Sequence, residues 1–280
     1  MSGKGLDIAL IQTRTPATPA AALAHVEPLI RQAAGGGARF ILTPEATNLL
    51  EQRRDRRGRA IVDEDQDAVV TGLRRLAAEL DVWLLIGSAI VRSGHAADDR
   101  AANRSLLIDA GGGVVARYDK LHVFDVDLAN GERYRESATI RPGDGAVVAD
   151  TPWGRLGMTV CYDIRFPHLF RQLARAGAAM ISVPAAFTVP TGEAHWEVLL
   201  RARAIETGCF VLAPAQGGTH EDGRKTWGRS TVVGPWGEVI ARADHDEPCV
   251  IHAKLDMGAV ETARASVPAL LHDRSFDAPL

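Results

Sequence analysis

The feature that most constrains the fold of this chain is the alternation of short apolar, strand-like runs with longer helical patterns. A strand-like run at residues 6–12 precedes an Ala-rich helical stretch at about 18–34, which three glycines at 35–37 bring to an end. A buried strand at 39–43 and a helix at about 66–80 repeat the pattern. Strands that alternate with helices in this way predict the α/β class. Further strands are expected at residues 82–90, 103–109, 114–118, 156–160, 179–184, 210–213, 230–233, 239–241 and 250–253, and further helices at 167–176 and 194–207.

Length and composition favour one domain. The chain has 280 residues, of which 46% are hydrophobic and 24% charged, and this is enough to bury a substantial core. No low-complexity linker interrupts it, and no internal repeat is evident. We therefore expect a single domain over residues 1–280, with a core at about 6–256 and a C-terminal tail at about 257–280, where the periodicity is lost.

The charge distribution gives no reason to expect nucleic acid or a membrane surface as a partner. The formal net charge is only −3. One dense basic run, at residues 53–59, lies among acidic residues, and we interpret it as a solvated loop or helix face rather than a binding patch. No segment approaches the roughly 20 apolar residues that span a bilayer.

The cysteines and the N-terminal segment indicate a cytoplasmic protein. Cys161, Cys209 and Cys249 cannot all pair within one chain, and neither they nor the histidines show a metal-binding spacing. The first seven residues lack the basic segment and apolar run of a signal peptide. A reducing, cytoplasmic location is expected, and free thiols are then available for chemistry.

Cys161 is the first candidate for chemistry. It follows the expected strand at 156–160 and precedes a helix signalled by Pro167, and functional side chains gather at such strand-to-helix turns. A helix N-terminus and a nearby cation would lower the pKa of its thiol. The alternative is that Cys161 is a small core residue.

Glu45 and Lys120 also stand directly after strand-like runs. A charged side chain at a buried strand end costs several kcal/mol unless it is paired, so an acid, a base and a thiol at three such ends suggest one cluster. Individually, Glu45 could instead cap the following segment, and Lys120 could be a charge at the rim of the sheet.

The residue types of this cluster suggest a mechanism. The Glu45 carboxylate would act as general base, taking the thiol proton of Cys161 and later activating water. The Lys120 ammonium and the backbone N–H of Tyr162 would stabilise the oxyanion of a tetrahedral intermediate. Neither a histidine nor a metal ion is required.

Three segments, LTPEATN, YDKLHVFDVD and GMTVCYDIRFP, resemble the signature blocks of the nitrilase, or carbon–nitrogen hydrolase, superfamily in their order and spacing. The resemblance covers about residues 6–256, and the catalytic Glu, Lys and Cys of the family match Glu45, Lys120 and Cys161. It implies an α-β-β-α four-layer sandwich, a thioester intermediate, no cofactor, and a homodimer formed through helical faces or a higher homo-oligomer.

The stretch PAAFTVPTGEAHWEVLLRARAIET is similar to the branch of deaminated glutathione amidases and omega-amidases. In that branch a second glutamate supports the lysine, and Glu136 in RESATIRPG matches it, so we expect Glu136 within hydrogen-bonding reach of Lys120. The charge-rich segment GERYRESATIRPG and the tail HDRSFDAPL match the branch only loosely, which leaves the substrate open.

The resemblance also implies substrate-binding residues. Arg165 occupies the position of an arginine that holds the substrate carboxylate in carbamoylase relatives; the alternative is a structural ion pair with Asp163 or a glutamate. Phe187, Thr188 and His195 lie in the block that lines the pocket in relatives, although His195 could equally be structural.

The sequence therefore predicts a cysteine-dependent amidase acting on a small, carboxylate-bearing linear amide, with deaminated glutathione as the leading substrate. A nitrile hydrolase, an omega-amidase acting on α-ketoglutaramate and an N-carbamoyl amino acid amidohydrolase are alternatives on the same residues. A third possibility is a binding or scaffolding module with a vestigial site, against which the presence of all three residue types argues.

Overall fold

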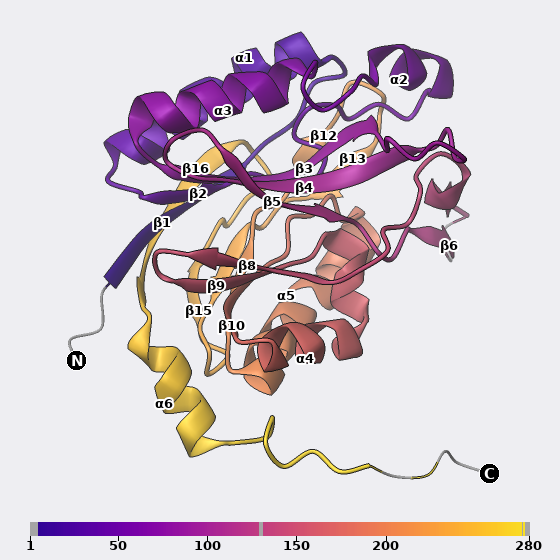
Figure 1. Cartoon of the computed structure of the whole chain (residues 1–280). Coiled ribbons are helices and arrows are strands. Elements are labelled where there is room, and N and C mark those ends of the chain that lie inside the picture. The colour runs from indigo at the N-terminus through magenta and orange to yellow at the C-terminus, as the bar shows by residue number, and fades with distance from the viewer. Residues whose placement is uncertain (1–4, 129–130, 276, 278–280) are drawn as a thin grey trace.

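The computed structural model describes residues 5–128, 131–275 and 277, and its centre is a pair of six-stranded sheets packed face to face (Figure 1). The first sheet has the order β16-β1-β2-β3-β4-β5, with β1, β2 and β3 parallel and the outer strands antiparallel. Its strands are β1 (Gly5–Gln12), β2 (Phe40–Leu42), β3 (Trp83–Arg92), β4 (Ala101–Ile108), β5 (Val114–Asp119) and β16 (Cys249–Asp256).

The second sheet repeats this plan in the order β15-β14-β11-β10-β9-β8, with a parallel centre formed by β9, β10 and β11. Its strands are β8 (Val147–Thr151), β9 (Gly154–Met158), β10 (Ala178–Ser182), β11 (Phe210–Ala213), β14 (Thr231–Val233) and β15 (Val239–Arg242). Two hairpins lie beside the sheets: β6 (Asp125–Asp127) with β7 (Arg133–Arg135), and β12 (Gly217–Thr219) with β13 (Lys225–Trp227).

Helices cover the outer face of each sheet (Figure 1). The first sheet carries α1 and α3, and the second carries α4 and α5. The resulting α-β-β-α order confirms the predicted four-layer α/β sandwich. The helices are α1 (Pro19–Gly35), α2 (Arg54–Ala60), α3 (Ala68–Leu80), α4 (Pro167–Arg175), α5 (Val189–Thr207) and α6 (Gly258–Ser266), with short 3-10 turns η1 (Glu136–Ala138) and η2 (Cys161–Arg165).

The side chains of each central strand alternate between the two faces of its sheet and so pack against the layers on both sides. Along β1, Leu6, Ile8 and Leu10 pack into the core between the two sheets, whereas Ala9 and Ile11 pack against α1 and α3. Successive side chains of a strand point to opposite faces, so a strand buried on both faces reads as a continuous apolar run. This is why the central strands were visible in the sequence.

The structure differs from the sequence-based expectation at several elements. The helix expected at 194–207 begins earlier, at Val189, because Pro190 occupies the first turn, where its missing N–H is tolerated. Of the side chains expected on its apolar face, Ile205 is 59% exposed. The expected irregular tail begins with α6, which Arg264 holds in place by donating to the carbonyl oxygens of Thr207 and Ala178. Of the described helices, none is long and apolar enough to span a membrane.

Candidate active site

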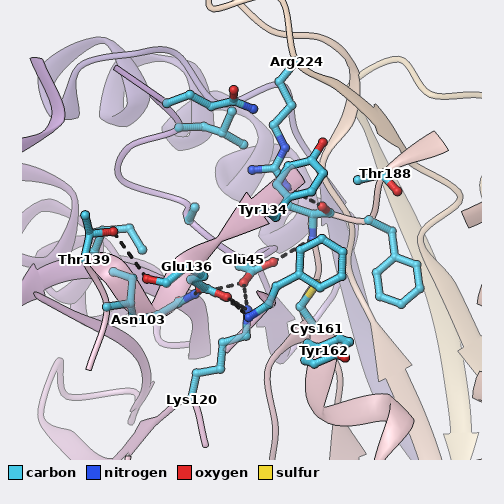
Figure 2. Close-up of a pocket in the computed structure, with 18 of the residues that line it drawn as sticks. Glu45, Asn103, Lys120, Tyr134, Glu136, Thr139, Cys161, Tyr162, Thr188 and Arg224 are labelled. Atoms are coloured by element: carbon cyan, nitrogen blue, oxygen red, sulfur yellow. Dashed lines mark hydrogen bonds and ion pairs between the residues drawn. The ribbon is translucent and has the colours of Figure 1, made fainter. Parts of the chain in front are cut away.

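The three residues predicted from the strand ends do form one cluster (Figure 2). Glu45 follows β2 and Lys120 follows β5 in the first sheet, whereas Cys161 follows β9 in the second sheet. Because both sheets direct these strand ends to the same edge of the sandwich, a carboxylate, an ammonium and a thiol meet although they are far apart in sequence. All three side chains are at least nine-tenths buried.

The Glu45 carboxylate is held at both oxygens. Its Oε1 accepts hydrogen bonds from Lys120 Nζ at 2.8 Å and Asn103 Nδ2 at 2.9 Å, and its Oε2 accepts from the backbone N–H of Ala186 at 3.0 Å. The backbone at Thr43, shortly before Glu45, packs directly against Gly87. A Cβ atom added at Gly87 would lie only 2.0 Å from the carbonyl oxygen of Thr43. The orientation of the carboxylate is therefore fixed from several sides.

Lys120 lies between two carboxylates. Its Nζ donates to Glu45 at 2.8 Å and to Glu136 Oε2 at 2.9 Å, so Glu136 is within the hydrogen-bonding reach that the resemblance implied. Glu136 is fixed in turn by the backbone N–H of Phe124 at 2.6 Å and by Asn103 Nδ2 at 3.1 Å. One ammonium is thus shared by two oriented carboxylates.

The electrostatic balance keeps both partners charged. Burial alone would raise the pKa of Glu45, but the charge and hydrogen bond of Lys120 lower it below its ordinary value. Burial would likewise lower the pKa of Lys120, but the carboxylates of Glu136 and Glu45 raise it well above its ordinary value. The ground state is therefore a carboxylate beside an ammonium.

The pKa of the Cys161 thiol is shifted in the opposite direction to the one expected. Burial, followed by the negative charge of Glu45, raises its pKa well above the ordinary value, and Lys120 offsets this only in part. The expectation that a helix N-terminus and a cation would lower this pKa was wrong, because desolvation is the larger effect. The resting nucleophile is a thiol that needs a base.

The backbone at Cys161 holds its side chain at a sharp turn. The residue has a positive φ of 51°, and its N–H donates to the carbonyl oxygen of Pro184 at 2.9 Å. A non-glycine residue in this region is strained by about 1–3 kcal/mol and persists where the surroundings enforce it, often at functional sites. The N–H of the next residue, Tyr162, is in the first turn of η2, where such groups lack a partner within the helix.

Asp163 ties the turn of Cys161 to the strand end of Lys120. Its carboxylate is fully buried and accepts from Tyr118 Oη at 2.7 Å, from the backbone N–H of Val160 at 2.8 Å, and from the backbone N–H of His122 at 3.0 Å. The suggested ion pair between Asp163 and Arg165 is therefore not formed, since these contacts take up the carboxylate.

A cavity of about 230 Å³ opens beside the cluster. Tyr162, Arg165, Phe187 and Thr188 line it. His195 does not line the cavity; its Nδ1 lies 3.2 Å from Arg165 Nη2. A contact between His195 and a ligand in the cavity is thus not supported, and the residue instead contacts the arginine.

Several residues of the cavity were missed by the sequence analysis. Asn103 contacts both carboxylates of the cluster, and Arg224 and Tyr134 form part of the wall. Arg57 also lines the cavity and donates to Thr139 Oγ1, so the basic run is not only a solvated face. Arg224 and Tyr134 lie on or beside three-residue strands, which are too short for a periodic signal.

The α-β-β-α sandwich and the buried carboxylate–ammonium–thiol cluster together define a nitrilase-like hydrolase. Comparison with known proteins gives the same result: the carbon–nitrogen hydrolase family matches residues 7–265. The deaminated glutathione amidase of Yersinia enterocolitica is 43% identical over 97% of this chain and 94% of its own length. The chain belongs to the carbon–nitrogen hydrolase family, and it is a hydrolase of carbon–nitrogen bonds other than peptide bonds.

Solved structures agree with this assignment. The NitFhit protein of Caenorhabditis elegans superposes with a TM-score of 0.88 at 33% identity, covering 98% of this chain and 66% of that one. A glutamate-to-glutamine mutant of the amidase from Nesterenkonia sp. AN1 superposes with a TM-score of 0.77 at 27% identity, covering 94% and 98%. In that amidase mutant, acrylamide has added to the active-site cysteine.

Proposed function

We propose that this protein is an amidase that hydrolyses the amide of deaminated glutathione through Glu45, Lys120 and Cys161. The observation that carries the proposal is the buried Glu45–Lys120 contact of 2.8 Å, with the buried Cys161 thiol in the same cavity, which arginines line. The similarity to deaminated glutathione amidases from Yersinia enterocolitica and Synechocystis, at 43% and 37% identity, supports the choice of substrate.

In the first step, Glu45 takes the proton of the Cys161 thiol as the sulfur attacks the amide carbonyl carbon. The raised pKa of the thiol makes this base necessary, and the lowered pKa of Glu45 keeps the base ionised. The negative charge that develops on the carbonyl oxygen is stabilised by the Lys120 ammonium and the Tyr162 N–H.

In the second step, the tetrahedral intermediate collapses, the C–N bond breaks, and Glu45 returns its proton to the leaving amine. A thioester between Cys161 and the acyl group remains. Glu45 then takes a proton from water, and the water oxygen attacks the carbonyl carbon of the thioester. The Lys120 ammonium again stabilises the oxyanion that forms. Release of the carboxylic acid regenerates the thiol. Glu136 acts on Lys120 as a positioning residue.

Arg165 is proposed to hold the carboxylate of the acyl half of the substrate. It forms no ion pair with a carboxylate in the described part of the chain, and its guanidinium lies over the rings of Phe187 at 5.5 Å and Tyr162 at 6.0 Å. A bidentate guanidinium–carboxylate contact would fix the register of the amide against Cys161. Phe187 and Thr188 would form the adjacent wall, and His195 would orient Arg165 rather than touch substrate.

A substrate panel tests the function. Purified protein is given deaminated glutathione, α-ketoglutaramate, an N-carbamoyl amino acid and a simple nitrile, and release of amine, ammonia or CO2 is measured. The highest kcat/KM is expected for deaminated glutathione. Preference for α-ketoglutaramate, the carbamoyl compound or the nitrile would contradict the substrate and indicate an omega-amidase, a carbamoylase or a nitrilase, respectively.

The chain is further proposed to act as one domain, as a homo-oligomer, in the cytoplasm. Val198 is 68% exposed on α5 and Trp236 is 63% exposed, and such apolar side chains on the helical face favour contact with a second copy. All three cysteines are free, which suits a reducing compartment. A monomeric mass in solution would contradict the oligomer.

A further inference from the structure

Among the residues that the structure describes, five arginines line the cavity, and their partners differ. Arg133 and Arg135 both pair with Asp127, at 3.4 and 2.8 Å, and Arg57 donates to Thr139. Arg165 and Arg224 differ, because neither forms an ion pair with any carboxylate among the residues that the structure places. Among the described residues, Arg165 and Arg224 therefore bring charges to the cavity wall that no ion pair with a carboxylate matches.

Within the described residues, the guanidinium of Arg224 is oriented by one hydrogen bond. Its Nη2 donates to the carbonyl oxygen of Ala186 at 2.7 Å, and its guanidinium carbon lies 6.0 Å from the centre of the Tyr134 ring. The neighbouring carboxylate of Asp222 accepts from two backbone N–H groups instead, those of Arg224 and Gln52. The guanidinium of Arg224 is thus fixed at the cavity wall and still has N–H groups that can donate to a ligand.

One of these N–H groups is at the Nε atom of Arg224. It is buried and has no hydrogen-bond partner within the described structure. A buried donor without a partner costs about 1–3 kcal/mol, and such groups in native proteins often await a ligand or a water molecule. Because Nη2 already donates to Ala186, the donors that remain for a ligand are Nε–H, the second N–H of Nη2 and those of Nη1, and a guanidinium can present such donors in pairs to a carboxylate.

Arg224 and Arg165 lie at the two ends of a chain of aromatic contacts. Arg224 lies over Tyr134, and Arg165 lies over Tyr162 at 6.0 Å. Between them, Phe124 contacts both tyrosines, with ring centres 5.1 Å apart in each case. The two cations are therefore fixed against different side chains of the cavity wall, Arg224 against Tyr134 and Arg165 against Tyr162 and Phe187.

The position of Arg224 relative to Glu45 assigns it to one half of the substrate. Ala186 joins the two, since its N–H donates to Glu45 and its carbonyl oxygen accepts from Arg224. Figure 2 shows Glu45 between Lys120 and Arg224. The leaving amine must lie next to Glu45, which protonates it, and the link through Ala186 puts Arg224 within the same part of the cavity, where it can meet a group on the amine half.

We propose that Arg224 forms a second anion subsite, which binds a carboxylate carried by the amine half of the amide. This inference rests on the proposed amidase function and defines its substrate class: amides with one carboxylate on the acyl half, at Arg165, and another on the amine half, at Arg224. Deaminated glutathione fits this class, whereas α-ketoglutaramate carries the same acyl group but releases only ammonia.

A matched pair of amides tests the subsite. Deaminated glutathione and its C-terminal carboxamide differ only in whether the amine half carries a charge. The ratio of their kcat/KM values is measured for wild type, Arg224→Gln, Arg224→Lys and Arg165→Gln, with Arg155→Gln on the distant β8–β9 hairpin as surface control. Arg224→Gln is expected to lower the ratio by about 10- to 100-fold, as for loss of a charge-assisted hydrogen bond, and Arg224→Lys to recover part of it.

The outcomes separate the two proposals. Arg165→Gln should lower kcat/KM for both amides and leave their ratio close to that of wild type. If Arg224→Gln lowers both amides equally, Arg224 only supports the Ala186 backbone and the subsite is refuted, while the amidase function stands. If wild type hydrolyses neither amide, the amidase function itself fails, and the subsite fails with it.

Discussion

Replacing Glu136 by Gln isolates the effect of the second carboxylate on Lys120. The glutamine keeps the size of the side chain, and its oxygen can still accept from Lys120 and from the N–H of Phe124, which both contact Glu136 Oε2. Its NH2 group then faces Asn103 Nδ2, which is also a donor, at the present distance of 3.1 Å. The variant therefore loses one charge and the two hydrogen bonds that Glu136 Oε1 accepts, from Asn103 at 3.1 Å and from Lys120 at 3.2 Å, but little volume.

The structure sets the size of the effect. Hydrogen bonds to charged groups contribute about 1.5–3 kcal/mol, and 1.4 kcal/mol is a factor of ten, so we expect kcat to fall by about 10- to 100-fold. The free energy of unfolding should fall less, by about 1 kcal/mol, because Lys120 keeps Glu45 as a partner. Steady-state kinetics and urea denaturation measure the two quantities.

The pH profile supplies a readout that a purely structural role would leave unmoved. The carboxylates of Glu136 and Glu45 raise the pKa of Lys120, so removing one of them lowers that pKa. The active form is the ammonium, and the alkaline limb of the rate should therefore move to lower pH in Glu136→Gln. Glu79→Gln, on the exposed surface of α3, is the control. An unchanged kcat with an unmoved alkaline limb would refute the support role.

Four further predictions concern the cluster and the buried Asp163 beside it. Glu45→Gln should lower kcat by about two to four orders of magnitude through loss of the base, and Cys161→Ala should abolish turnover with the fold intact; substantial activity in either variant would contradict its role. Alkylation of Cys161 by iodoacetamide should be slow at neutral pH and accelerate toward alkaline pH, because its pKa is raised above 9.0; a rate that is already maximal at neutral pH would indicate a thiolate. Asp163→Asn should lower the free energy of unfolding in urea by about 3 kcal/mol, because an amide nitrogen would face donors that the buried carboxylate now satisfies. Wild-type stability of this variant would show that the hydrogen bonds accepted by Asp163 do not stabilise the fold.

Much of the cluster was predictable because strand ends are visible in a sequence. Glu45, Lys120 and Cys161 each follow an apolar run, and charged residues at such positions need partners. The four-layer fold followed from the family resemblance, since strand and helix patterns alone do not say how two sheets pair. The contact of Glu136 with Lys120 likewise came from the resemblance, because η1 has no periodic pattern.

Other features depend on packing that a sequence does not display. The raised pKa of Cys161 results from burial beneath segments that are distant in the chain, so the local argument from a helix N-terminus gave the wrong sign. Arg224 lies between β12 and β13, strands of three residues each, and only the folded chain brings it to Ala186. His195 matched a family block, yet it contacts Arg165 rather than the cavity.

The central claim is that Cys161 carries the acyl group of the substrate as a thioester. Wild-type protein is mixed with deaminated glutathione, quenched in acid during turnover, and analysed by intact-protein and peptide mass spectrometry, with Cys161→Ala as control. We predict a mass increase equal to the acyl group, located on the peptide that contains Cys161 and absent from the variant. Turnover without any adduct in the quenched enzyme, or an adduct on Cys209 or Cys249, would contradict the mechanism.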